Sequence, residues 1–235
     1  MTPSIANIPA TKTCWHHFKT ATLLQQHLAE KIITQANDCI ATHSFFSIVL
    51  AGGETPRAIY AQLQHSKTDW QHWHIYFGDE RCLPEGDVNR NDSMAFTAWL
   101  NHVPVPRNNI HTIPAQLSAA ECVNHYTKTL QCIERFDLVL LGLGEDGHTA
   151  SLFPANDWGT TPDAPSVIAV NNAPKPPAQR ITLSAQRLSR AVQVWFIVSG
   201  KNKNDACVRW QKGDTIPAAA IASLNGVDVF TDIPA

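Results

Sequence analysis

Residues 136–144 read FDLVLLGLG, an apolar run that ends in a glycine-rich turn. A run of this length without regular polar alternation is typical of a β-strand that is buried on both faces. Such strands occur in parallel sheets that are covered by helices on each side. The segment therefore predicts an α/β protein built on a parallel sheet.

The segments around this strand alternate between helix and strand patterns. Residues 20–42 carry apolar side chains four positions apart, which predicts an amphipathic helix. Ser118 and Glu121 have capping-box spacing at the start of another helix. Further strands are expected at residues 45–50, 73–77, 167–170, 180–184 and 192–200, and further helices within residues 51–63, 118–133, 201–210 and 217–223. This alternation predicts a mostly parallel sheet with helices on both faces.

Length and composition are those of an ordinary folded protein. The chain has 235 residues, 44% of them hydrophobic and 16% charged, which excludes the disordered and fibrous classes. Since no linker or internal repeat interrupts it, we expect residues 1–235 to form a single domain. The net charge of -2 gives no reason to expect nucleic acid or an anionic membrane as a partner.

The compartment is inferred from the N-terminus and the cysteines. There is no signal-peptide pattern and no run of about 18 apolar residues, so we expect a cytoplasmic protein. The 6 cysteines are scattered, without Cys-x-x-Cys or another metal-ligand spacing. We therefore expect buried free thiols in a reducing compartment and no metal site.

Four loops rich in glycine and charge follow expected strands. They read AGGET at 51–55, GDER at 78–81, GLGEDGH at 142–148 and SGKNK at 199–203. In open parallel sheets, ligands bind outside the carboxyl ends of the strands. The convergence of four such loops predicts a binding site at that edge.

Several residues of these loops suit an anion. Gly52 and Gly53 let the backbone approach a ligand and direct N–H groups at it, and the Thr55 hydroxyl adds a donor. A plain strand-to-helix turn explains the glycines equally well, and the loop matches no nucleotide-binding motif. The guanidinium of Arg81 suits phosphate or carboxylate oxygens, although a solvated turn is the simpler explanation of GDER. Arg180 and Lys201, at the ends of expected strands, complete a set of basic residues for a phosphate.

His148 is one of 11 histidines, and its context distinguishes it from the others. It follows the glycine turn after the most apolar strand, and Asp146 stands two residues earlier. An imidazole in this place can act as a general base near neutral pH, whereas a surface histidine is the alternative. The sign of its pKa shift is left open. A nucleophilic serine or a metal site is less favoured, because there is no G-x-S-x-G motif and no ligand set around this single histidine.

Taken together, the loops resemble those of the 6-phosphogluconolactonase family. The matching stretches are AGGETP (51–56), GDERCLP (78–84), GLGEDGHTASLFP (142–154), PPAQRITLS (176–184) and SGKNK (199–203). The resemblance implies a Rossmann-like three-layer α/β/α sandwich. It also implies hydrolysis of 6-phospho-D-glucono-1,5-lactone to 6-phosphogluconate in the oxidative pentose phosphate pathway, by a monomer or small homo-oligomer with no cofactor.

The same resemblance implies roles for individual residues. His148 would be the general base that activates water, Asp146 would support it, and Arg81 would contact the substrate or the oxyanion. The positions that hold the 6-phosphate in the family correspond here to Gly52, Gly53, Thr55, Arg180 and Lys201.

Two stretches depart from the family pattern. The glycine loop usually reads Ser-Gly-Gly-Ser-Thr-Pro, so Glu54 is an added carboxylate, which we expect to point away from the phosphate. Residues 88–95 read VNRNDSMA where the family shows Ser-Asn before a helix.

Two alternative functions remain open. Glucosamine-6-phosphate deaminases carry DGHIAFNEP, and here Phe153 stands at the position of their catalytic glutamate. A non-catalytic sugar-phosphate-binding protein would keep the phosphate pocket without needing His148.

Overall fold

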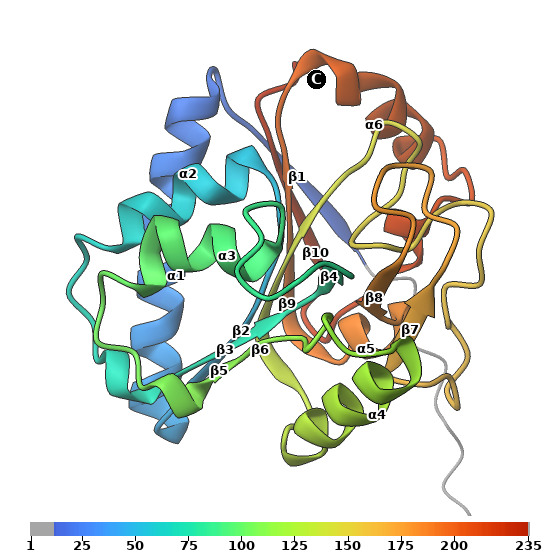
Figure 1. Ribbon diagram of the computed structural model, residues 1–235. Helices are drawn as coiled ribbons and strands as arrows, with labels where there is room; N and C mark the ends of the chain where they lie inside the picture. The colour runs from blue at the N-terminus through green and yellow to red at the C-terminus, as the bar shows by residue number, and fades with distance from the viewer. Residues whose placement is uncertain (1–11, 235) are drawn as a thin grey trace, which may run out of the picture.

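A seven-stranded parallel sheet forms the centre of the molecule in the computed structural model, which describes residues 12–234 (Figure 1). The strand order is β1-β10-β9-β6-β2-β3-β5. The strands are β1 (Thr13–His17), β2 (Phe46–Leu50), β3 (Trp73–Phe77), β5 (Ile110–His111), β6 (Phe136–Gly142), β9 (Ala191–Val198) and β10 (Val227–Thr231). The prediction of a mostly parallel sheet is confirmed.

Helices cover both faces of this sheet, which gives the expected three-layer α/β/α sandwich (Figure 1). One side carries α1 (Ala21–His43), α2 (Glu54–Leu63) and α3 (Asn91–Ala95), and the other carries α4 (Ala119–Thr129), α5 (Ala185–Ser189) and α6 (Asn204–Gln211). The predicted capping box of α4 is present, with Ser118 and Glu121 bonding to each other's backbone N–H groups. None of the helices in residues 12–234 has the length and apolar character needed to cross a membrane.

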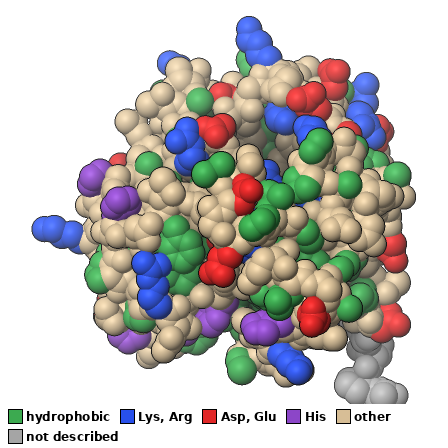
Figure 2. Space-filling model, in the orientation of Figure 1, with side chains coloured by type: hydrophobic (Ala, Val, Ile, Leu, Met, Phe, Trp, Pro, Cys, Tyr) green, Lys and Arg blue, Asp and Glu red, His purple; other side chains and the backbone are tan. Residues whose placement is uncertain are grey.

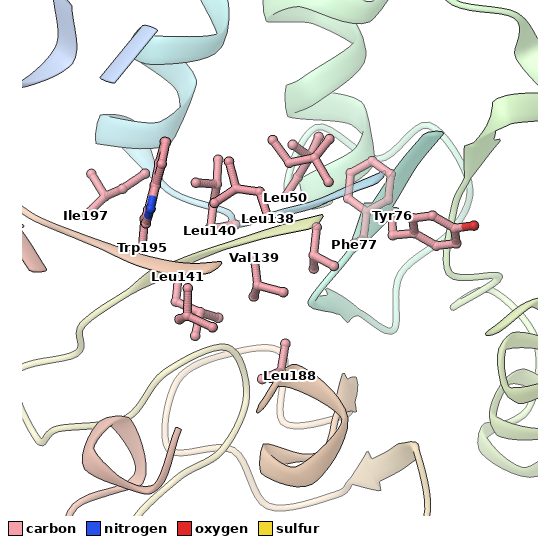
Figure 3. Packing of buried hydrophobic residues seen from close by; sticks show 14 of the residues in the cluster. Leu50, Tyr76, Phe77, Leu138, Val139, Leu140, Leu141, Leu188, Trp195 and Ile197 are labelled. Carbon is pink, nitrogen blue, oxygen red and sulfur yellow. The ribbon is translucent and has the colours of Figure 1, made fainter. Parts of the chain in front are cut away.

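The core supports the interpretation of residues 136–144. Every residue of β6 from Phe136 to Leu141 is buried. Figure 3 shows Leu138 and Leu140 on one side of the sheet and Val139 and Leu141 on the other, where Leu188 of α5 packs. Because β6 lies between β2 and β9, both of its faces meet covering layers, and the apolar run follows from that position.

A second sheet corrects the expected arrangement of two strands. Its order is β4-β8-β7, it is antiparallel, and its strands are β4 (Asp79–Arg81), β7 (Val167–Val170) and β8 (Arg180–Leu183). No helix separates β7 from β8, so the chain returns antiparallel instead of crossing over into the main sheet. The GDER stretch, interpreted as a turn, contains β4. The segment expected to be helical at 217–223 forms only a 3₁₀ turn, Pro217–Ala220.

The first prediction concerns His111 of β5, which is partly buried and stacks on Tyr76 with ring centroids 4.4 Å apart. Burial, with a smaller contribution from His74, lowers the pKa of His111 from 6.5 to about 4. Below pH 6.5 the unfolded chain therefore binds a proton that the folded chain does not. We expect the free energy of unfolding to decrease as the pH falls from about 6.5 to about 4.

Urea denaturation at several pH values measures this dependence. The variant His111→Phe keeps a ring in place but does not titrate, so its stability should fall less steeply over the same range. His125→Phe, a change at an exposed histidine, serves as the control and should match the wild type. Equal pH dependence in wild type and His111→Phe would contradict the assignment.

Candidate active site

The orientation of His148 depends on the carboxylate of Asp146 and on the space left by Gly144. Asp146 Oδ1 accepts a hydrogen bond from the His148 backbone N–H at 3.1 Å and lies 2.5 Å from Nδ1. A Cβ at Gly144 would lie 2.0 Å from Nδ1, so the ring fits only over a glycine. Since an ionised carboxylate only accepts, Nδ1–H donates and Nε2 is left as the basic nitrogen.

The ionisation state of Asp146 suits its role in orienting His148. Its burial opposes ionisation, but the hydrogen bonds from the His148 backbone and ring, and the charge of that ring, lower the pKa of Asp146 below its usual range. The carboxylate is therefore ionised at neutral pH, and it fixes both the tautomer and the orientation of His148.

A cavity of about 510 Å³ opens where the main-sheet strands end. In Figure 2, basic side chains lie around a hollow in the upper part of the molecular surface. The sequence-predicted residues that line the cavity are Gly52, Gly53, Thr55, Arg81, His148 and Arg180. The loops after β2 and β6 supply Gly52, Gly53, Thr55 and His148, and strands β4 and β8 of the second sheet supply Arg81 and Arg180.

Lys201 does not lie in this site. It is exposed at the start of the short 3₁₀ helix Lys201–Lys203 and is not among the residues that line the cavity. Lys203, two positions later on the same turn, does line it, as does Lys175. The SGKNK loop does line the cavity, but sequence alone does not show which of its lysines the helical turn directs toward it.

The glycine loop needs both of its glycines. A Cβ at Gly52 would lie 2.0 Å from Asn91 Oδ1, and Gly53 has φ of 113°, in the region that favours glycine. Gly53 stands at the N-terminus of α2, where no side chain caps the helix. The backbone N–H groups there remain available to an anion.

Glu54 takes the expected direction. Its carboxylate accepts hydrogen bonds from Arg57 on the next turn of α2, at 3.0 Å and 2.5 Å, and its side chain is 84% exposed. The added charge is therefore directed along α2 and is paired with a guanidinium, while Glu54 as a residue still belongs to the cavity lining.

The second sheet places two arginines side by side at the cavity. Arg81 of β4 and Arg180 of β8 are direct partners in the antiparallel register. Arg180 donates to backbone carbonyls of Pro177 at 2.8 Å and of Lys175 and Pro176 at 3.1 Å, while Arg81 donates to Asn89 at 2.5 Å. Like charges directly opposite each other in a sheet are destabilising, so this pair favours an anion between them.

Burial further disfavours the charged Arg180. The residue is 6% exposed, and this burial lowers the pKa of its guanidinium. The carboxylates of Asp79 and Glu80 oppose the shift, whereas the charge of Arg81 adds to it. An anionic ligand would offset both the burial and the repulsion.

Several cavity residues have no clear signal in the sequence. Asn91 begins α3, and its Nδ2 donates to the Asp79 carbonyl at 2.9 Å and to Asp79 Oδ1 at 3.0 Å. Its Oδ1 and the hydroxyl of Thr149 are buried without a hydrogen-bond partner among residues 12–234, and both residues line the cavity. Buried polar atoms of this kind need a partner, which a bound ligand or water would supply.

The nearby serine is engaged elsewhere. Ser151 Oγ donates to Asp79 Oδ2 at 2.5 Å and is buried. Because this hydroxyl is bonded to Asp79 and not to His148, the geometry agrees with the low weight given to a nucleophilic serine.

Comparisons with known proteins agree with the fold and the loops. The chain is 34% identical over 228 residues to a 6-phosphogluconolactonase of Mycobacterium tuberculosis, covering 90% of this chain and 87% of the relative. It is 31% identical over 218 residues to the 6-phosphogluconolactonase of Mycobacterium leprae, covering 87% of each chain. The crystal structure of 6-phosphogluconolactonase from Thermotoga maritima matches with a TM-score of 0.87 at 26% identity, covering 94% of this chain and 99% of that one.

A family model matches almost the whole length of the chain. Its description is glucosamine-6-phosphate isomerases/6-phosphogluconolactonase, and it covers residues 19–230. These residues include all four loops around the cavity. The protein therefore belongs to the glucosamine-6-phosphate isomerase/6-phosphogluconolactonase family.

Proposed function

We propose that the protein hydrolyses 6-phospho-D-glucono-1,5-lactone to 6-phosphogluconate. The observation that carries the proposal is that His148, oriented by Asp146, lines the same cavity as Arg81 and Arg180. The match to relatives named 6-phosphogluconolactonase, which extends over most of their length, supports it. We further assign the reaction to the oxidative pentose phosphate pathway and to the cytoplasm as part of this proposal.

Each step of the proposed reaction uses a group at the cavity. His148 Nε2 accepts a proton from water as the water oxygen bonds to C1 of the lactone, and the carbonyl oxygen becomes an oxyanion. Arg81 or a backbone N–H of the loops stabilises that charge, an effect worth about 100- to 1,000-fold in rate. The bond between C1 and the ring oxygen then breaks, and the imidazolium returns the proton to that oxygen.

The phosphate occupies the basic part of the cavity in this proposal. Gly52 and Gly53 offer backbone N–H groups, Thr55 offers a hydroxyl and Arg180 offers a guanidinium. Lys203 takes the place that the family resemblance gave to Lys201.

The position of Phe153 beside His148 disfavours a deaminase. The ring of Phe153 is buried and lies with its centroid 4.8 Å from that of His148. An apolar ring there contacts the base where a deaminase needs its glutamate. A binding protein without activity would have no use for the fixed tautomer of His148.

Proton release at neutral pH tests the activity directly. Addition of the phosphorylated lactone should give acid faster with the protein than by spontaneous hydrolysis. No acceleration would contradict the lactonase assignment, and ammonia release from glucosamine 6-phosphate would favour a deaminase. Binding of 6-phosphogluconate without turnover of either substrate would indicate a sugar-phosphate-binding protein.

Removing the base should lower kcat strongly. We expect His148→Ala to lose about 100- to 10,000-fold in kcat, because general-base catalysis contributes about this much. Asp146→Asn should also lower kcat, since an amide no longer enforces protonation at Nδ1. His125→Ala, at an exposed histidine on α4, is the control. Full activity in His148→Ala would refute the mechanism while leaving the fold unaffected.

Variants of the two lysines in the 3₁₀ turn Lys201–Lys203 test where the phosphate binds. Loss of a charged hydrogen bond costs about 1.5 to 3 kcal/mol, so Lys203→Met should lower kcat/KM for the phosphorylated lactone by about 10- to 150-fold. Hydrolysis of unphosphorylated glucono-1,5-lactone should be nearly unchanged. Lys201→Met is the matched control and should behave as wild type with both substrates. A larger loss in Lys201→Met than in Lys203→Met would overturn the placement of the phosphate.

A further inference from the structure

Three side chains with different metal-binding groups meet at the edge of the main sheet opposite the cavity. Cys39 and His43 lie on the last turns of α1, and Asp137 is the second residue of β6. A thiol sulfur, an imidazole nitrogen and a carboxylate oxygen from these residues lie within 4.8 Å of one another. The proposed lactonase reaction uses none of them.

The spacing of these atoms suits a small tetrahedral ion. His43 Nε2 lies 3.1 Å from Asp137 Oδ1. Bonds of about 2.0 to 2.3 Å to a tetrahedral zinc place neighbouring ligand atoms about 3.3 to 3.8 Å apart. Cys39 and His43 are four residues apart, which puts them on one face of the helix. All three atoms lie within 4.8 Å of one another, so small side-chain movements would let them share one ion.

A second layer of hydrogen bonds already orients two of the three groups. Asp137 Oδ2 accepts from the Ser47 backbone N–H at 2.8 Å and from its hydroxyl at 2.7 Å, which leaves Oδ1 toward His43. Cys39 Sγ accepts from Gln35 Nε2 at 3.3 Å, and Gln35 Oε1 in turn accepts from Gln193 at 3.0 Å. Outer-shell bonds of this type position metal ligands in proteins.

Exposure gives the site an entry path. Cys39 and Asp137 are buried, whereas the His43 side chain is 38% exposed and borders solvent. A cation can therefore reach the two buried ligands past the partly exposed imidazole.

We propose that Cys39, His43 and Asp137 bind one thiophilic divalent cation, with zinc as the best fit and water at a fourth position. Sulfur and imidazole ligands select zinc over magnesium and calcium, which prefer oxygen alone. Binding forms the sulfur–metal bond as the thiol proton leaves to solvent, and no electron is transferred. The scattered cysteines indicated no metal site because the third ligand comes from a strand remote in sequence.

Such an ion would join the C-terminal end of α1 to the start of β6. The ligand set closes no substrate site, so its role is to stabilise this junction of helix and sheet. A cation that binds only the folded chain raises its stability.

Cobalt substitution tests the site, because Co²⁺ bound by a thiolate gives a charge-transfer band in the near ultraviolet and tetrahedral coordination gives intense visible bands. We expect wild-type protein to bind one equivalent of Co²⁺ with both signals, and zinc to displace it. The charge-transfer band should be lost in Cys39→Ser, and His43→Gln should bind at least about tenfold more weakly. Zinc should raise the Tm of wild type but not that of Cys39→Ser.

Two matched variants control for other ligands. Cys132→Ser removes an exposed thiol, and His72→Gln removes a histidine that lies 3.0 Å from Asp69 without a thiol beside it. Both should keep the cobalt signals, and circular dichroism verifies the fold of every variant. Absence of a thiolate band in wild type, or its survival in folded Cys39→Ser, would overturn the proposal. Neither result depends on lactonase activity.

Discussion

The burial of β6 on both faces is the constraint from which the rest of the molecule follows. Strands β2 and β9 flank it, and α-helical layers lie above and below. Its single early polar residue, Asp137, is accommodated because Ser47 of β2 bonds to the carboxylate and to its backbone N–H. The strand can end only at the middle of the sheet edge, so the loop that carries His148 emerges between the loops of its neighbours.

Patterns that depend on local spacing could be predicted from the sequence. The stripe of α1, the capping box of α4 and the apolar run of β6 each need only a few neighbouring residues to be recognised, and all three are present. Strands β1 and β10 were missed, since they are short and mix polar with apolar residues. They form because β10 pairs with β9 and β1 pairs with β10 at one side of the sheet.

The site likewise contains residues that local sequence patterns predict and residues that only tertiary contacts bring to it. The loops that contain His148, Asp146, Gly52 and Gly53 can be recognised by their glycine and charged residues. The structure brings His148 and both glycines to one cavity. Asn91 reaches that cavity only because buried Glu80 accepts hydrogen bonds from the first two N–H groups of α3 and so joins this helix to β4. Contacts of this kind between distant segments leave no periodic trace in a sequence.

The second sheet has a thermodynamic consequence beyond its place in the cavity wall. Its first two strands, β4 and β8, place Arg81 and Arg180 opposite each other, and like charges in that position work against the hydrogen-bonded ladder. An anion that bonds to both would therefore act as an electrostatic clasp for the ladder. Ligand binding and the stability of this small sheet would then be linked, because an anion that binds only the paired strands favours their pairing.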